Sequence, residues 1–165
     1  MAIPSSGSLA FSAIQTEFGG SNPISMSEYY AGGDNVASGT SGDSGTIPSS
    51  GTIALSEFYG STARVAITLT ISSNTANYSI YSNKGGTYSA GISDITLVNN
   101  AVVSSSSTGT AALDTGSGWT SGDTLTIDNN STIVGDGGDG GAGGAVSGTT
   151  AADAVAGGAG GNAIN

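Results

Sequence analysis

Cysteine and histidine are both absent from the 165 residues, and lysine and arginine together number only 2. Without thiol or imidazole groups, the chain has neither the usual ligands of zinc nor the commonest general base. Arg64 and Lys84 alone cannot form the basic surface that binds phosphate backbones, which excludes a nucleic-acid partner. An anionic membrane surface would also repel a chain whose net charge is -10. We therefore predict no metal, no cofactor and no nucleic acid.

Charge of either sign is scarce, and so are long apolar runs. Charged residues make up 8% of the chain, against roughly 25% in typical soluble domains. No apolar run approaches the ~20 residues of a membrane span, so we predict no membrane insertion. The opening MAIPSSGSLAF has no charged region before an apolar core, which argues against a secretory signal peptide. We expect assembly in the cytoplasm of the cell that makes the protein.

A repeated unit fills positions 1–62. Residues 3–12 (IPSSGSLAFS) return at 47–56 as IPSSGTIALS, and a shorter copy, PISMSEYY, occupies 23–30. Each copy predicts a short extended piece followed by one helical turn. Gly19, Gly32 and Gly60 follow these turns, where glycine commonly ends a helix.

Capping chemistry accounts for the acids of these copies. Ser12 with Gln15, and Ser25 with Glu28, have the spacing of a capping box. All three glutamates of the chain lie in the copies or in the helical turns that follow them. We interpret them as capping residues rather than as a carboxylate site.

The aromatic residues of the repeat suggest a contact with another molecule. Units this short do not bury large side chains by themselves, so we expect them to pack against a partner or a second copy. Residues 32–46, between two copies, read as a flexible linker. We therefore predict a docking segment over 1–62, with these residues facing a virion partner or another copy: Phe11, Phe18, Tyr29, Tyr30, Phe58 and Tyr59.

A β-structured region is predicted over 63–134. Val65, Ile67, Leu69 and Ile71 alternate with small residues, as in a half-buried strand. The motif at 67–69 returns at 95–97 and 125–127, so its spacing is nearly constant. Asparagine pairs follow the last two copies, at 99–100 and 129–130, where left-handed backbone would suit a tight turn. Equivalent strands at this spacing predict stacked layers, in a β-solenoid-like or elongated β-sandwich arrangement.

Trp119 lies between glycine-rich turns. One interpretation is an anchor beneath a loop, and the other is a platform for sugar stacking, with Tyr78, Tyr81 and Tyr88 as the remaining members of the set. Asp114 and Asp123 could in principle form the carboxylate pair of a glycosidase. Their settings, LDTG and SGDT, are typical of turns instead, and we predict no enzyme.

Residues 135–165 form a glycine-rich tail. Its first part, 135–145, can be divided into triplets, which matches the three residues per turn of a polyproline-II-type helix. Glycines on two faces would let another backbone approach closely, while Asp136, Asp139 and Ala142 occupy the third face. Calcium-binding nonapeptide repeats fit poorly, because Ala142 stands where an aspartate is needed. A solvated linker is the remaining alternative.

The segments IPSSGSLAFSAIQTEFGGSNPISMSEYYAGG and ITLTISSNTANYSIYS, followed by ALDTGSGWTSGDTLTIDNNSTIVGDGGDGGAGG, resemble tailed-bacteriophage virion proteins. The likeness is to glycine-rich tail-fibre and receptor-recognition proteins. It implies polyglycine-II-like packing of the glycine tracts near a host-binding tip. It also implies a virion location.

From the residues and this resemblance we expect a virion structural protein, a tail or surface fibre that contributes to host attachment. Its partners would be other virion proteins and copies of itself, in a homo-oligomer for which a trimer is one form. A glycan or protein of the host surface would be the receptor. The alternatives are a capsid or filament decoration protein, or a secreted bacterial adhesin or matrix-filament subunit.

Overall fold

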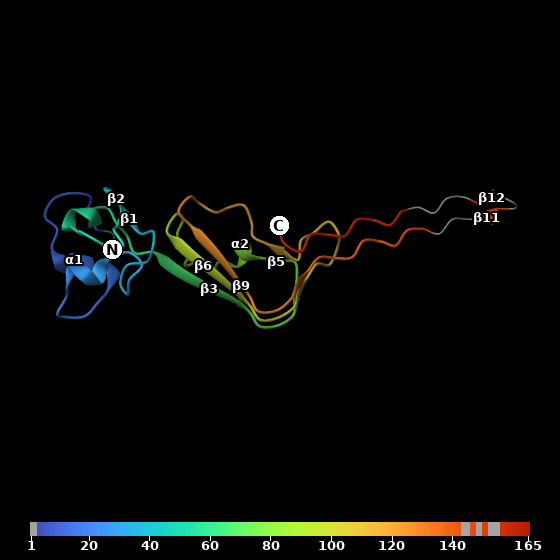
Figure 1. Ribbon diagram of the computed structural model, residues 1–165, viewed down its shortest axis with the longest axis horizontal. Coiled ribbons are helices and arrows are strands. Elements are labelled where there is room, and N and C mark those ends of the chain that lie inside the picture. The colour runs from blue at the N-terminus through green and yellow to red at the C-terminus, as the bar shows by residue number, and fades with distance from the viewer. Residues whose placement is uncertain (1–2, 143–145, 148–149, 152–155) are drawn as a thin grey trace. The chain divides into compact units, whose positions relative to one another are not determined.

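The computed structural model describes residues 3–142, 146–147, 150–151 and 156–165. The chain divides into two compact units. The first unit contains residues 1–66, 88–94 and 120–124, and the second contains 67–87, 95–119 and 125–165. With 25% strand and 13% helix, the predicted β class is confirmed. Figure 1 shows the elements of each unit.

The described part of the first unit contains three short helices and one hairpin, besides the first residues of three longer strands. The helices are α1 (Phe11–Phe18), η1 (Met26–Tyr29) and η2 (Leu55–Phe58). The hairpin pairs β1 (Ser41–Gly42) with β2 (Gly45–Thr46) in antiparallel fashion. Each helix therefore begins at the same position of the three sequence copies. Gly19, Gly32 and Gly60 have φ of 85°, 85° and 69°, which confirms the predicted glycine stops.

The predicted linker over 32–46 is ordered, and that interpretation is wrong. Val36 and Thr40 are 0% and 1% exposed, and β1 and β2 fall within this stretch. The Ile47 amide donates to the Thr40 carbonyl over 3.0 Å. Composition alone suggested flexibility, but one buried valine and a hairpin are enough to fold the segment onto its neighbours.

The capping prediction is half right. Ser12 lies inside α1, whose N-cap is Ala10 without a side-chain bond, so the Ser12–Gln15 box is wrong. Ser25 is the N-cap of η1, but its hydroxyl accepts from the Ser27 amide and not from Glu28. Glu57 does reach back to the Ala54 amide, over 2.7 Å. Each of the three helices begins at an apolar residue. The first therefore begins at Phe11, one residue before its predicted cap, Ser12.

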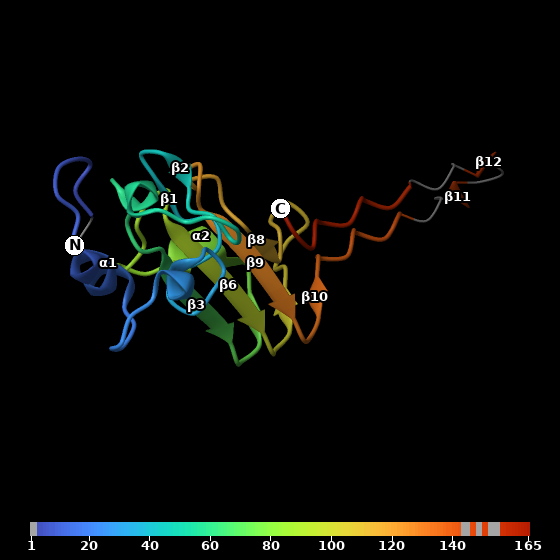
Figure 2. The same ribbon diagram turned by 60° about the vertical axis from the view of Figure 1, so that its left-hand side comes forward.

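Three longer strands form one sheet in the order β3-β6-β9. They are β3 (Val65–Ile71), β6 (Ser93–Asn99) and β9 (Thr124–Asn129), and the division between the units falls within each strand. Their arrows point the same way (Figure 2). These are the three equivalent strands predicted from the sequence, lying as neighbours. Alternation places Ile95 and Leu97 of the central strand at 1% and 0% exposure, as a half-buried strand requires.

Short strands repeat the same spacing in the second unit. In the sheet β10-β7-β4, parallel pairing joins Thr75 to Val103 and Val103 to Ile133. These partners are separated along the chain by the same spacing as the repeated motif, as the sequence predicts. The strands are β4 (Thr75–Ala76), β7 (Val103–Ser104) and β10 (Ile133–Val134).

A third set of parallel pairs completes this arrangement. Tyr78 pairs with Leu113, and Leu113 forms a further parallel bridge with Ile164. The strands involved are β5 (Tyr78–Ser79) and β8 (Leu113–Asp114), and a short helix, α2 (Ile80–Asn83), follows β5. Val103 and Leu113 are both 0% exposed. At roughly 1.5–3 kcal/mol for each buried aliphatic side chain, these contacts between layers stabilise the unit.

The asparagine pairs have another role than the predicted one. Asn77 is the only non-glycine residue in the described part with a left-handed φ, so the pairs at 99–100 and 129–130 are not left-handed turn residues. Instead, Asn99 Nδ2 donates to Asn129 Oδ1 over 2.8 Å, and Asn130 Nδ2 donates to Asn100 Oδ1 over 3.2 Å. Asn99 is fully buried. The repeated asparagines thus form a ladder between adjacent layers.

Candidate functional site

The aromatic residues of the N-terminal repeat form a core among themselves. Tyr29 and Phe58 are 0% exposed and Phe18 is 8% exposed. Their rings meet edge to face, with centroids 6.0 Å apart for Phe18–Phe58 and 6.4 Å for Tyr29–Phe58. The premise that these units lack a core of their own is therefore wrong. One copy is too small to bury its aromatic side chains, but three copies bury one another's.

The other three predicted docking residues are only partly buried. Phe11 packs edge-on against Tyr29, with centroids 5.5 Å apart. The Tyr30 hydroxyl donates to the Gly51 carbonyl, and the Tyr59 hydroxyl donates to the Gly7 carbonyl over 2.5 Å. These two tyrosines hold the loops that precede η2 and α1. Their docking role stays a prediction.

Sequence reasoning identified only Phe11 of a set of apolar residues that the three copies share. The first residue of each helix is large and apolar, and so is the residue two positions before it. All of them except Leu55 are partly buried and pack against the core, whereas Leu55 is 40% exposed. They are Leu9, Phe11, Ile24, Met26, Ile53 and Leu55. Aligning the copies on their helix starts, rather than on their aromatics, would have found them.

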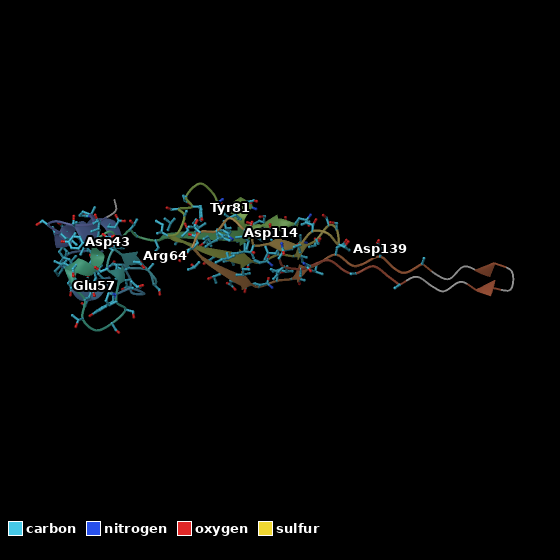
Figure 3. The ribbon with its side chains drawn as sticks, turned by 90° about the horizontal axis from the view of Figure 1, so that it is seen from above. Asp43, Glu57, Arg64, Tyr81, Asp114 and Asp139 are labelled. Atoms are coloured by element: carbon cyan, nitrogen blue, oxygen red, sulfur yellow. The ribbon has the colours of Figure 1, made fainter. Side chains whose placement is uncertain are left out.

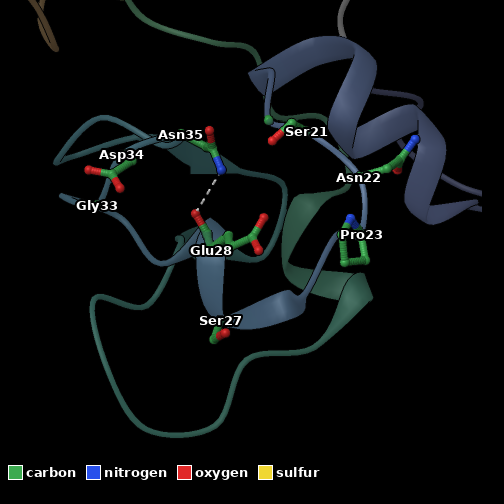
Figure 4. Close-up of a pocket in the computed structure, with 9 residues that line it drawn as sticks. Ser21, Asn22, Pro23, Ser27, Glu28, Gly33, Asp34 and Asn35 are labelled. Atoms are coloured by element: carbon green, nitrogen blue, oxygen red, sulfur yellow. Dashed lines mark hydrogen bonds between the residues drawn. The ribbon is translucent and has the colours of Figure 1, made fainter.

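A polar pocket of about 570 Å³ lies between the loop at 20–23, η1 and the loop that follows η1. Figure 4 shows carboxylates, amides and hydroxyls around it, including Glu28, Asp34 and Asn35. Asn35 Nδ2 donates to the Glu28 carbonyl over 3.2 Å and holds one wall in place. No cluster of three metal-ligating side chains exists among the residues that the structure describes.

Arg64, which is labelled in Figure 3, forms an ion pair with Asp94 in the first unit. Its guanidinium makes two bonds to the Asp94 carboxylate, Nε to Oδ2 at 2.8 Å and Nη2 to Oδ1 at 2.6 Å. Nη2 also donates to the Gly122 carbonyl over 2.7 Å. The Arg64 side chain is only 6% exposed. The hydrogen bonds from Arg64 hold the pKa of Asp94 below its ordinary value.

Asp123 gathers four donors. Its carboxylate accepts from the Tyr88 hydroxyl at 2.6 Å and from the amides of Gly91, Ser93 and Thr120 at 2.8, 3.1 and 2.9 Å. Burial by itself raises the pKa of Asp123, but the four hydrogen bonds outweigh it and the pKa is lowered. Asp123 therefore clamps two loops together. Asp114 accepts from the Gly116 amide at 3.0 Å, so the turn chemistry predicted for both acids is confirmed.

The four residues of the predicted sugar-stacking set are divided between the two units, and their role in sugar binding stays a prediction. Tyr88 belongs to the first unit, where Asp123 binds it. Tyr78 lies in β5, beside the turn at 70–75. In the second unit, Tyr81 and Trp119 meet edge to face, with centroids 4.9 Å apart. The Trp119 indole donates to the Thr115 carbonyl over 2.9 Å, as an anchor beneath a loop would.

Tyr81 is covered by its own chain. The Lys84 ammonium lies 3.6 Å from its ring centroid, and a Cβ added at Gly116 or Gly118 would overlap its side chain. A groove of about 640 Å³ runs past this ring, lined also by Ser79 and Asp114. Hydroxyl and carboxylate groups line the groove beside the Tyr81 ring.

The glycine-rich tail folds back on itself in a hairpin (Figures 1 and 2). The Gly158 amide donates to the Asp139 carbonyl, and the Gly161 amide to the Asp136 carbonyl, each over 2.8 Å. Both donors and acceptors recur every three residues, the period of a polyproline-II-type helix. At the far end, β11 (Val146–Ser147) pairs antiparallel with β12 (Thr150–Ala151). Residues 143–145 of the predicted tract lie outside the described part.

Close approach explains one row of glycines. A Cβ added at Gly135 would overlap the Gly161 carbonyl, and one at Gly138 would overlap the Gly158 carbonyl. The prediction that another backbone passes close to glycines of this tract is confirmed at Gly135 and Gly138. That backbone belongs to the same chain, not to a neighbouring one.

Parallel strand layers and a glycine hairpin define a protein of the β class. In the part of the chain that the structure describes, no helix is long and apolar enough to cross a membrane. Residues 66–165 match the family Phage tail fibre adhesin Gp38. The match covers more than half of the chain, which therefore belongs to this family. Neither a curated protein nor a solved structure matches the chain.

The chain is thus a phage tail-fibre protein involved in host attachment, located in the virion. This confirms the resemblance found in the sequence. The family supports a structural rather than an enzymatic role, with other virion proteins and a host receptor as partners. The match begins at residue 66, so the N-terminal repeat lies before it.

Proposed function

We propose that the chain is a tail-fibre adhesin in which residues 1–62 attach it to another virion protein. The observation that carries the adhesive role is the family match over 66–165. Capsid or filament decoration, and a bacterial adhesin or matrix filament, are the alternatives that it disfavours. The parallel pairing at the spacing of the repeated motif supports a solenoid-like stack of three layers as the rigid support.

The N-terminal attachment rests on the shared apolar residues. Phe11, Met26 and Leu55 begin the three helices at equivalent positions and are partly accessible. Exposed apolar residues in repeated positions are typical of protein interfaces rather than of free surfaces. Three equivalent positions would suit a partner that presents three equivalent surfaces, such as a trimeric fibre.

Host attachment is assigned to the second unit. The glycine hairpin and the groove beside Asp114 offer backbone amides, hydroxyls and a carboxylate, which are groups that bind the hydroxyls of a glycan or the polar surface of a protein. The chain brings only two cations, so binding to an anionic surface through charge is disfavoured.

The test locates the chain and then separates the two roles. Antibody labelling of intact virions should place the chain on tail fibres, and purified chain should compete with phage for adsorption to host cells. The double variant Met26→Ser/Leu55→Ser should still compete for adsorption but should no longer join fibres. Ser49→Ala/Ser50→Ala, in a nearby loop of the same unit, is the matched control. Labelling on the capsid would contradict the proposal, and so would fibre assembly that tolerates the double variant.

A further inference from the structure

The groove beside Tyr81 and Asp114, both labelled in Figure 3, is lined mainly by groups that form hydrogen bonds. Its volume is about 640 Å³, and the residues around it all belong to the second unit. Clefts of roughly 300–1,000 Å³ are the usual sites of small ligands in proteins. Its polar side chains include Ser79, Ser82, Thr115 and Ser117 besides the carboxylate. The groove therefore suits a ligand that is itself rich in hydroxyl groups.

Internal hydrogen bonds fix the walls of this groove. Asp114 Oδ1 accepts from the Gly116 amide at 3.0 Å, which sets the orientation of the carboxylate. The amide and the hydroxyl of Thr115 both donate to the backbone oxygen of Asn165, at 3.0 and 2.8 Å. A surface that is already held in place loses little conformational freedom when a ligand binds, so more of the interaction energy remains as affinity.

Other polar atoms of the groove remain available to a ligand. Asp114 Oδ2 and the hydroxyls of Ser82 and Ser117 make no hydrogen bond to another residue of the described part. A carboxylate oxygen accepts only, whereas a serine hydroxyl both donates and accepts. Sugar hydroxyls can do both as well, so a sugar can satisfy all three groups at once.

Charge narrows the class of ligand. Asp114 is the one charged side chain among the described residues that line the groove. Arg64 is bound to Asp94 and Lys84 lies over the Tyr81 ring, and neither cation lines the groove. An anionic sugar or a phosphate would therefore meet a negative charge with no cation to offset it. A neutral ligand avoids this cost.

We propose that this groove binds a neutral sugar, whose hydroxyls donate to Asp114 Oδ2 and bond to Ser82 and Ser117. The proposal rests on the assignment of host attachment to the second unit, and it names the part of the receptor that the groove contacts. A protein partner is disfavoured, because protein interfaces are anchored by aromatic or arginine side chains in desolvated pockets. Here Lys84 and the loop at 116–118 already cover the Tyr81 ring.

Trp119 can report on binding in the groove. It is the only tryptophan of the chain, its indole donates to the Thr115 carbonyl over 2.9 Å, and its ring meets Tyr81 edge to face. The experiment titrates the full chain with glucose, galactose, mannose, rhamnose and N-acetylglucosamine. It follows Trp119 fluorescence and, in isotopically labelled chain, the NMR shifts of the Gly116 and Ser117 amides. At least one of these sugars should give a saturable change, with a dissociation constant on the order of 1 mM.

Two variants test the groups that the sugar uses. Asp114→Asn keeps one oxygen for the Gly116 amide but places an amide donor where the second carboxylate oxygen was. It should weaken sugar binding about tenfold or more. Ser82→Ala removes an exposed hydroxyl and should weaken binding about threefold or more.

Asp128→Asn is the matched control for charge. It removes the same charge from an exposed position of the second unit outside the groove, and it should leave affinity for the sugar unchanged. Slow hydrogen exchange at the Thr115 amide checks that each variant keeps the structure around the groove. If Asp114→Asn loses that protection, the Ser82→Ala titration decides.

The proposal is overturned if none of the five sugars changes the Trp119 signal up to its solubility limit. It is also overturned if folded Asp114→Asn and Ser82→Ala chains bind as tightly as the wild type. Tighter binding of N-acetylneuraminic acid, an anionic sugar, would overturn the assigned class. If the groove fails but attachment holds, the chain still competes with phage for adsorption. If attachment fails but the groove holds, sugar binding persists without that competition.

Discussion

Asp123 illustrates how one carboxylate can hold distant parts of the chain. Its four donors come from the stretches 88–93 and 120, which lie far apart in the sequence. Asp94 performs a similar task with Arg64, whose side chain is almost fully buried. Because the chain has few charged side chains, few other charged groups compete for the partners of Asp94 and Asp123.

The lowered pKa values of Asp94 and Asp123 predict sensitivity to acid. Folding stabilises their charged forms, so their contribution is present above the ordinary aspartate pKa of about 3.9 and is lost as pH falls through the lower folded pKa. Asp123→Asn should cost about 1–3 kcal/mol at pH 7 and flatten the loss of stability below pH 4. Urea unfolding at several pH values measures this.

Asp128→Asn, at an exposed carboxylate, is the control and should leave the pH profile as it is. An Asp123→Asn chain whose stability falls with acid as steeply as that of the wild type would show that the clamp has no role in acid sensitivity.

The asparagine ladder makes a second prediction about single side chains. Asn99→Ala removes a buried amide that bonds to Asn129 and to the Ala101 amide, and it should cost about 1–3 kcal/mol of unfolding free energy. Asn100→Ala, one position along and exposed, should change it by only about 0.5 kcal/mol. Thermal unfolding of the two variants compares them directly. Equal effects would contradict the role of burial in the ladder.

Among the elements, the glycine hairpin is the most sensitive to an added Cβ atom. Its two runs meet through hydrogen bonds at every third residue, each worth about 0.5–1.5 kcal/mol. Ordering each residue costs roughly 1–2 kcal/mol, so the margin is narrow. A Cβ in the contact row removes that margin.

Gly138→Val should therefore separate the two runs, because its side chain would occupy the place of the Gly158 carbonyl. Hydrogen exchange at the Gly158 and Gly161 amides should become as fast as in an unfolded peptide. Asp139→Ser, which is exposed and next to it in sequence, should leave exchange slow. If valine is tolerated at Gly138 without faster exchange, the close approach of the two runs is disproved.

For the whole chain, the division into two compact units predicts that damage stays local. Phe58→Ala removes a ring at the centre of the first unit and should cost about 3–5 kcal/mol there. Hydrogen exchange should accelerate across α1, η1 and η2, while amides paired between β4, β7 and β10 stay protected. Leu55→Ala, at a more exposed position of the same helix, is the matched control. Loss of protection in all sheets at once would contradict separate stability of the units.

Regularities of short range could be predicted from the sequence. The β class, the three equivalent strands and their near-constant spacing follow from alternation and repetition, because a strand places every second side chain on one face. Glycine at 19, 32 and 60 indicated left-handed backbone at these positions, because a residue without a Cβ adopts positive φ most readily. The three-residue period of the tail was equally visible.

Only the tertiary structure decided which of these pieces meet. The three copies bury one another's aromatic side chains, and the asparagines bond between layers instead of forming left-handed turns. The glycines of the tail contact the second half of the same hairpin. A Cβ added at Gly137 or Gly140 would meet no described atom within 4 Å. Such contacts join residues far apart in sequence, and their free energy depends on the space that the rest of the fold leaves between them. Local patterns determine the shape of each segment but do not specify its neighbour.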